Sequence, residues 1–383
     1  MLDPIAAAPH VFARLDDESE SRHVWSVLGR ADLLRTVYSE GQPSTGVDFA
    51  RLARLIEAVD ERCSIGATLP IVVQLTTALP ILAAEPGPAR DVAERAVTGE
   101  LSVALAVTDM HSGTDLLSMG TSAVIDDLSV VLNGAKSWIA SGMSADYFLV
   151  LARKNAARHF TSFVWLLVPS SAEGVSRRAV DSNLYPCSGM ASLEFRDVVL
   201  PRDVLVGRSG RGLTTFTRHI AVERLGSALW GVALCRRVVQ RTVGHLAMRP
   251  HGDNSLWEVE SIRQRVAACV VEIEELGALA ASLGRKVTDD YDTVAGAMLK
   301  AATGATVASV LSECAQLHGA EGFVRGGLQE LRAQAAAFGV GGGPTEVALS
   351  IVADGLERVF MVWDRERAGL IRGQREDARP PRV

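Results

Sequence analysis

The stretch at residues 107–142 combines small hydrogen-bonding residues with one large aromatic side chain. Its hydroxyl and backbone N–H groups come from Thr108, Ser112, Gly113, Thr114 and Ser141. Donors of this kind can face a polar planar ligand, while the indole ring of Trp138 covers one face of that ligand. A tryptophan in such a stretch is also typical of ordinary packing within a sheet. The composition therefore indicates a candidate ligand site without identifying the ligand.

The residues around this candidate site alternate as β-strands do. An apolar run at 102–107 precedes a polar loop at 108–115, and we expect alternating strands to follow, joined by Asn133-Gly134. Further strand patterns cover 147–153, 160–168 and 192–200. The sequence therefore predicts a middle β domain at residues 102–207.

Helical patterns flank this β domain on both sides. Residues 22–39 and 48–60 carry apolar positions at helical spacing, and 64–84 is a nearly uncharged segment, broken by Pro70 and Pro80, that we expect to be buried. Apolar residues again recur every three or four positions through 213–243 and 294–317. These patterns predict an N-terminal helical domain at 1–101, a C-terminal helical bundle at 208–365 and a flexible charged tail at 366–383.

Charge and cysteine content exclude several functional classes. The net charge of −6 provides no basic stripe for a nucleic-acid partner. Five cysteines far apart in sequence suit a reducing cytoplasm better than a disulfide framework, and no cluster indicates a metal site. The start of the chain lacks the pattern of an export signal, and we expect no membrane-spanning segment.

Several strings of the sequence, in order, resemble the acyl-CoA dehydrogenase family. They are VTDMHSGTDL, NGAKSWIASG, SLEFRDVVLP, AVERLGSALWG and CAQLHGAEGF, with a later GGGPTEV. The resemblance covers roughly residues 100–357 and is weak over the first fifty residues. It implies an α+β fold with an N-terminal helical domain, a middle β-barrel-like domain and a C-terminal four-helix bundle. It also implies FAD as the cofactor.

The resemblance implies α,β-dehydrogenation of an acyl thioester, in which a carboxylate removes the α-proton and the β-hydrogen passes as a hydride to N5 of FAD. Many family members carry this carboxylate on a loop whose place falls on Gly342, which has no side chain. A minority carry it on the first long helix of the bundle, immediately before an Arg, and Glu223 precedes Arg224 there. Alone, such a Glu is typical of a solvated helix surface. With Gly342 at the loop position, we assign Glu223 as the base.

Gly342 keeps a role through its backbone. The resemblance implies that its N–H hydrogen-bonds the thioester carbonyl and stabilises the developing enolate, as an oxyanion hole does. We expect burial against flavin and acyl chain to raise the pKa of Glu223 and Arg224 to lower it, and the sequence does not determine which effect is larger. The glycine run leads to Thr345 and Glu346 at a helix start with Pro344 in its first position, and such an N-terminus attracts anionic groups.

The resemblance also implies the cofactor contacts. Those within one subunit are Thr108, Gly113, Thr114, Trp138, Ile139, Ser141, Thr345 and Glu346, with Thr114 also near the thioester or pantetheine end of the substrate. Ala140 replaces a Thr that usually bonds near flavin N5, and Ser141 could substitute for it. The contacts expected from a neighbouring subunit are Arg249, Gln316 and Gly319. Substrate contacts are expected from Arg224 and from Met110, which with His111 replaces the family's usual Pro-Gly.

The sequence thus predicts a cytoplasmic FAD-dependent oxidoreductase that acts on an acyl thioester of coenzyme A or of an acyl or peptidyl carrier protein. We expect a homodimer or homotetramer that is reoxidised by an electron-transfer flavoprotein or by oxygen. Two alternatives stay open. One is a flavin-dependent monooxygenase or oxidase on the same fold. The other is a non-catalytic paralogue acting as a scaffold, motivated by Gly342, Ala140 and the altered sequence after Arg249.

Overall fold

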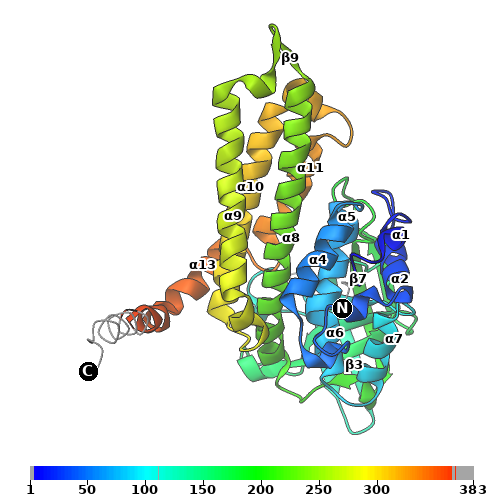
Figure 1. Ribbon diagram of the computed structural model, residues 1–383. Helices are drawn as coiled ribbons and strands as arrows, with labels where there is room; N and C mark the ends of the chain where they lie inside the picture. The colour runs from blue at the N-terminus through cyan, green and yellow to red at the C-terminus, as the bar shows by residue number, and fades with distance from the viewer. Residues whose placement is uncertain (1–3, 111, 365–366, 368–383) are drawn as a thin grey trace, which may run out of the picture.

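The computed structural model describes residues 4–110, 112–364 and 367 of the chain (Figure 1). A group of N-terminal helices lies beside a bundle of long helices, and the sheet comes between them in the sequence. The predicted fold class, helical then β then helical, is confirmed. His111 and the tail predicted at 366–383, apart from Arg367, lie outside the described residues.

The N-terminal part is a compact set of short helices, and it differs from the sequence prediction at the prolines of 64–84. The helical spacing at 22–39 corresponds to two helices, because Asp32 has a left-handed φ of 60° that ends one helix before the next begins. The predicted break at Pro70 and Pro80 is wrong, because the chain stays helical from Ile65 to Ala83 through one widened turn. The helices are α1 (Pro9–Phe12), α2 (Ser21–Arg30), α3 (Leu33–Thr36), η1 (Pro43–Thr45), α4 (Phe49–Asp60), α5 (Ile65–Val73), η2 (Gln74–Ala78), α6 (Leu79–Ala83) and α7 (Pro88–Val97).

The middle of the chain forms one mixed sheet. Its strand order is β6-β7-β3-β2-β4-β5-β8, and β1 pairs with β4 in parallel. Because β1 and β3 both end near one another in this sheet, the loop after β1 and the last residues of β3 meet at one side. The strands are β1 (Val103–Ala106), β2 (Ser122–Ile125), β3 (Ser129–Ile139), β4 (Tyr147–Arg153), β5 (Phe163–Pro169), β6 (Val175–Ala179), β7 (Ala191–Pro201) and β8 (Leu205–Val206).

The predicted turn at Asn133-Gly134 is wrong. β3 continues through both residues, and its pairing with β7 shifts register between Leu132 and Gly134, as at a β-bulge. Gly134 has a φ of 137°, and an added Cβ would lie 2.5 Å from Cα of Thr121. A bulge that approaches another strand this closely needs glycine as a turn does, so the Asn-Gly pair is ambiguous in sequence. The predicted strand at 160–168 begins only at Phe163, after a short 3₁₀ turn.

The C-terminal part is built on α8 (Gly212–Met248), a helix about 55 Å long at 1.5 Å per residue. The carbonyl of Gly212 accepts a hydrogen bond from Trp165 of β5 at 3.0 Å, which fixes the start of α8 against the sheet. α8 packs side by side with α9 and α10, and a small hairpin projects from its far end (Figure 1). The remaining elements are β9 (Pro250–His251), β10 (Asn254–Ser255), α9 (Glu260–Thr288), α10 (Thr293–Leu317), α11 (Leu328–Ala335), α12 (Ala337–Val340) and α13 (Thr345–Asp354).

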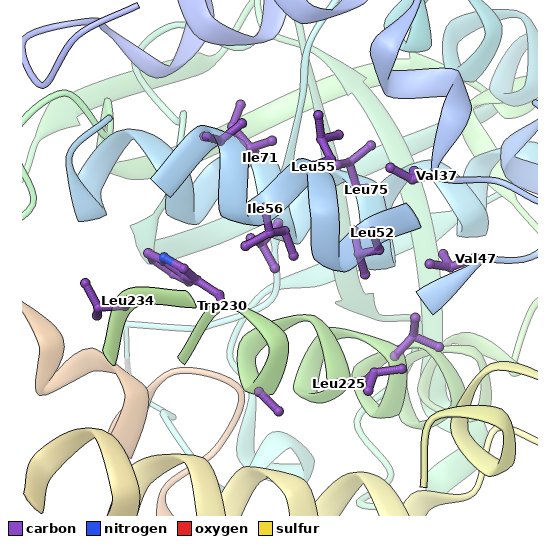
Figure 2. Packing of buried hydrophobic residues seen from close by; sticks show 14 of the residues in the cluster. Val37, Val47, Leu52, Leu55, Ile56, Ile71, Leu75, Leu225, Trp230 and Leu234 are labelled. Atoms are coloured by element: carbon purple, nitrogen blue, oxygen red, sulfur yellow. The ribbon is translucent and has the colours of Figure 1, made fainter. Parts of the chain in front are cut away.

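A buried apolar layer joins α8 to the N-terminal helices. Figure 2 shows Leu225 and Trp230 of α8 facing Leu52 and Ile56 of α4, and all four side chains are buried. Trp230 also donates a hydrogen bond to the buried carboxylate of Asp60 at 2.8 Å. Burial of large apolar side chains stabilises such an interface by about 1.5–3 kcal/mol for each side chain. The layer therefore sets the position of α8 relative to the helices that face its middle.

Three helical stretches of the described chain are long and apolar enough to span a membrane by length and composition alone. They are Ile65–Ala83, Thr293–Leu317 and Leu328–Asp354. The most apolar window of Ile65–Ala83 is 89% buried inside this fold, whereas that of Leu328–Asp354 is only 17% buried. Core packing therefore accounts for the apolar character of the first stretch but not of the last.

Candidate active site

A cleft of about 610 Å³ lies between the sheet, the N-terminal part of α8 and the loop that precedes α13. Its apolar wall includes Leu69 and Val73 of α5 and Phe216 and Ile220 of α8. The sequence-predicted residues that line it are Thr108, Gly113, Thr114, Trp138, Ile139, Glu223, Arg224 and Gly342. Side chains separated by more than two hundred residues in sequence thus meet in one cavity.

Trp138 offers a large flat surface to this cleft. It is the last residue but one of β3 and has a left-handed φ of 58°, and it stays 54% exposed although the next residue, Ile139, is buried. A non-glycine residue in this region is strained, and such strain is often found at ligand sites. The hydroxyl-bearing residues Thr108 and Thr114 line the same cleft. An exposed indole beside small donors fits a planar polar ring such as that of a flavin.

A buried ion pair holds the loop that carries Thr108 and Thr114. Nζ of Lys136 lies 3.6 Å from Oδ2 of Asp109, and both side chains are almost fully buried. Thr121 donates to the same carboxylate oxygen from its backbone N–H at 2.9 Å and from its hydroxyl at 2.6 Å. Burial lowers the pKa of Lys136 to about 7, although Asp109 acts in the opposite direction. Sequence reasoning missed this pair, whose only signal is a lysine inside an otherwise half-buried strand.

Glu223 and Gly342 lie next to each other, as their sequence assignment requires. An added Cβ on Gly342, whose φ is 73°, would lie 3.7 Å from Oε1 of Glu223. Arg224 donates a hydrogen bond from Nε to the carbonyl of Gly342 at 3.0 Å, which fixes this peptide group beside the carboxylate. Burial raises the pKa of Glu223, and a hydrogen bond from Thr77, Arg224 and Lys300 each lower it to a smaller extent.

Lys300 is a buried charge that the sequence analysis did not single out. Its side chain is fully buried and donates to the backbone carbonyl of Phe338. Burial and the neighbouring Arg224 lower its pKa to about 8, and Glu223 acts in the opposite direction. Lys300 also lines a side cavity of about 90 Å³, closed by Trp230, that shares Glu223 with the main cleft. The carboxylate therefore faces two cations, one on its own helix and one on α10.

Four residues that the sequence predicted for the site do not line the cleft. The hydroxyl of Ser141 lies 3.3 Å from that of Ser21, and Ser141 does not line the cleft, whereas Ala140 does. The left-handed φ of Ser141, 57°, turns its side chain toward α2. Met110 is 51% exposed and lines a separate groove on the sheet. Thr345 and Glu346 begin α13 without lining the cleft, and Pro344 precedes the first helical position rather than occupying it.

Arg249, Gln316 and Gly319 lie at the far end of the bundle. Arg249 follows Glu223 by 26 residues along α8, which corresponds to about 39 Å of helix. Its guanidinium pairs with Glu321, and all three predicted residues are exposed. In a single chain these residues therefore cannot contact a ligand portion bound at Trp138. Among the described residues, no group of three or more His, Cys, Asp or Glu side chains is arranged to bind a metal ion.

Comparisons with known proteins give consistent matches. The family model for the acyl-CoA dehydrogenase middle domain matches residues 104–200, and that for the acyl-CoA dehydrogenase C-terminal domain matches residues 210–357. Together they cover more than half of the chain. Both models contain residues of the cleft, since Trp138 falls in the first and Glu223 and Gly342 fall in the second.

Individual relatives and structures agree with these matches. The chain is 26% identical over 273 residues, 70% of its length and 69% of the relative's, to acyl-[acyl-carrier-protein] dehydrogenase MbtN of Mycolicibacterium paratuberculosis. It is 25% identical over 331 residues, 83% of its length and 78% of the relative's, to cyclohex-1-ene-1-carbonyl-CoA dehydrogenase of Syntrophus aciditrophicus. The solved structure of PigA with FAD and proline superposes with a TM-score of 0.84 at 18% identity, covering 93% of this chain and 97% of that one.

Proposed function

The chain belongs to the acyl-CoA dehydrogenase family, and from this we infer that it is an FAD-dependent oxidoreductase that introduces an α,β double bond into an acyl thioester. One observation carries the assignment of the base. A carboxylate whose pKa is raised by burial, that of Glu223, faces the same cleft as the exposed ring of Trp138. A base must be close to the substrate and poorly solvated to abstract a weakly acidic proton.

Different residues of the cleft bind the cofactor and remove the proton from the substrate. Trp138, Thr108 and Thr114 would hold the isoalloxazine end of FAD, which supplies the two-electron oxidant when bound. Glu223 takes the α-proton of the acyl group. The apolar side chains of Leu69 and Val73 exclude water from the acyl group and the carboxylate, which makes the carboxylate more basic.

Gly342 and Arg224 stabilise the charge that develops on the thioester. Within the described chain, no group accepts a hydrogen bond from the N–H of Gly342, while its carbonyl is occupied by Arg224. This N–H is therefore available to the thioester carbonyl oxygen when the α-proton leaves. The loss of one such donor typically costs about 10²–10³-fold in rate in other enzymes. The loop position thus contributes a backbone donor here, and the helix contributes the carboxylate.

The test of this proposal is the Glu223→Gln variant with Glu346→Gln as a matched control, since Glu346 follows the glycine loop but is exposed and does not line the cleft. Both variants are expected to purify with FAD, judged by the absorbance spectrum. A panel of coenzyme A-linked and carrier-protein-linked thioesters is then mixed with each under argon. Glu223→Gln is expected to reduce its flavin about 10²–10⁴-fold more slowly than the control. Equal rates would remove Glu223 as the base.

We also propose that the working unit is a homodimer or homotetramer. Arg249, Gln316 and Gly319 could reach a cofactor at Trp138 only from another copy, given the length of α8 between them. A second support is the apolar surface of the projecting segment at 345–364, where the exposed large apolar residues are Leu349, Leu356, Phe360, Met361 and Trp363. Light scattering that gives a monomer with full FAD content would contradict the proposal.

For the acceptor we propose an electron-transfer flavoprotein, on the strength of the family membership. The reduced enzyme, prepared with substrate under argon, is expected to be reoxidised faster by such a flavoprotein than by air. The same thioester panel shows whether the substrate is linked to coenzyme A or to a carrier protein. The acyl-carrier-protein dehydrogenase among the relatives makes the carrier-linked thioesters a necessary part of that panel.

A further inference from the structure

We propose that Thr77 is a positioning residue for Glu223, an inference that rests on the proposed role of Glu223 as the base. The Thr77 hydroxyl donates to Oε2 of Glu223 at 2.9 Å, and the Thr77 side chain is fully buried. The other carboxylate oxygen, Oε1, is the one nearest to the Gly342 position. Thr77 thus occupies one oxygen of the carboxylate and leaves the other directed toward the place of the thioester.

Thr77 reaches the carboxylate because it lies in a widened helical turn. In η2 the N–H of Leu79 bonds to the carbonyl of Gln74, five residues back, as in a π-helix. The cause is Pro80, which has no N–H to donate and whose ring would clash with the carbonyl four residues before it. Such single π-turns are frequent at functional sites because they shift the side chains that they carry.

The surroundings stabilise this widened turn. The carbonyl of Leu75 has no helical donor left, because the N–H of Leu79 is taken by Gln74 and Pro80 has none. The hydroxyl of Tyr38 donates to that carbonyl at 2.8 Å. The side chain of Gln74 accepts a hydrogen bond from the N–H of Val103 in β1 at 2.8 Å. Both contacts are buried, so the turn is fixed to α3's loop on one side and to the sheet on the other.

A glycine on α8 permits the contact between the two helices. Gly226 lies one turn after Glu223, and an added Cβ there would be 2.9 Å from Cγ2 of Thr76 and 3.0 Å from Cγ1 of Val72. The backbone of α8 therefore lies directly against the side chains of α5 and η2. This close approach brings the hydroxyl of Thr77 within hydrogen-bonding distance of a carboxylate 146 residues away in sequence.

The contact has a consequence for the charge state of the base. Burial raises the pKa of Glu223, and the hydrogen bond from Thr77 is the largest of the influences that lower it. Arg224 on the same helix and Lys300 on α10 are the other groups that lower this pKa. A donor to the ionised carboxylate keeps it available as a base at a pH where burial alone would protonate more of it.

Four substitutions separate this role from simple packing. Thr77→Val removes the hydroxyl at nearly constant volume, and Thr77→Ser keeps the hydroxyl. Thr76→Val is the matched control, because Thr76 is equally buried in the same turn but donates to the carbonyl of Val72 at 2.7 Å instead. Thr77→Ala is prepared as well, so that a variant without the hydroxyl is available if the valine does not fold.

The first measurement is an infrared titration of the FAD-containing enzyme, in which the Glu223 carboxyl band is identified by its loss in Glu223→Gln. Thr77→Val and Thr77→Ala are expected to raise the titration midpoint by about one pH unit, the shift that corresponds to losing a hydrogen bond to a charged group. Thr77→Ser and Thr76→Val are expected to keep the midpoint of the unaltered protein. Equal midpoints for Thr77→Val and Thr76→Val would overturn the proposal.

The second measurement is the pH dependence of substrate-driven flavin reduction. Because Glu223 must be ionised to act as a base, the acidic limb of this profile is expected to move to higher pH by the same amount in Thr77→Val. The infrared titration needs no substrate. Failure of the proposed dehydrogenase function can therefore be distinguished from failure of the proposed role of Thr77. If none of the thioesters reduced the flavin of the unaltered protein, the proposed function would be contradicted. A shift of the infrared midpoint in Thr77→Val would still support the contact between Thr77 and Glu223.

Discussion

Replacing Gly226 with alanine tests the packing that the site depends on. The new Cβ would lie 2.9 Å from Cγ2 of Thr76 and 3.0 Å from Cγ1 of Val72, against an optimum of about 3.5–4.0 Å between carbon atoms. Thr76 cannot rotate away freely, because its hydroxyl is bonded to the carbonyl of Val72 at 2.7 Å. Overpacking of this kind costs about 1–3 kcal/mol, offset by about 0.5–1 kcal/mol from removing a glycine within a helix. The difference between these two ranges is a net loss of about 0–2.5 kcal/mol, and we expect a value near its middle.

The control is Gly244→Ala in the same helix, where an added Cβ meets no atom within 4 Å. This variant is expected to be more stable by about 0.5–1 kcal/mol. Both are compared with the unaltered protein by urea unfolding, followed by circular dichroism at fixed protein and FAD concentrations, after refolding has been shown to be reversible. Gly226→Ala is also expected to move the acidic limb of flavin reduction in the direction of Thr77→Val. Stabilisation of both variants would refute the argument from close helix contact.

Two further outcomes follow from the buried lysines. Lys136→Met removes the cation 3.6 Å from the buried Asp109 carboxylate, and we expect a loss of about 3–5 kcal/mol in unfolding free energy together with weaker FAD retention on gel filtration. The exposed Lys286→Met is the control, and equal behaviour of the two variants would contradict the role of the pair. For Lys300, burial lowers the pKa from 10.5 to about 8 in the folded protein. Between pH 8 and pH 10.5 the unfolded chain therefore binds more protons than the folded protein, so the unfolding free energy should rise with pH over this range. Lys300→Met should lack this rise, and parallel curves for the two proteins would show that Lys300 is not the cause.

The parts of the site that sequence could predict are those set by local pattern. The order of helices, strands and helices follows from hydrophobic periodicity, which is a property of neighbouring residues. The pairing of Glu223 with Gly342 was predicted from the family resemblance, and the two positions do lie beside each other. Trp138 and Thr108 likewise line the cleft. Both belong to short strings that carry the family resemblance, so their positions could be predicted from the sequence.

The errors have a common physical origin in backbone conformations that short patterns do not determine. Asn133-Gly134 has the composition of a hairpin turn, but Gly134 serves a bulge that lies against Thr121. Ser141 follows Trp138 and Ile139 closely, yet its positive φ turns the hydroxyl to Ser21. In both cases the deciding contact is with a residue from another element, so the residue types alone were compatible with either outcome.

Thr77 is a residue of the site that no sequence motif could have predicted. Nothing in the segment around Pro80 resembles a catalytic string, and a threonine in an apolar helix is usually bonded to its own backbone, as Thr76 is. Thr77 differs from Thr76 only because a proline widens the turn, Tyr38 satisfies the carbonyl that this frees, and Gly226 lets α8 come close. If these conditions act together, Gly226→Ala combined with Thr77→Val should shift the acidic limb no further than Thr77→Val alone. Additive shifts would mean that Gly226 affects Glu223 by some route other than Thr77.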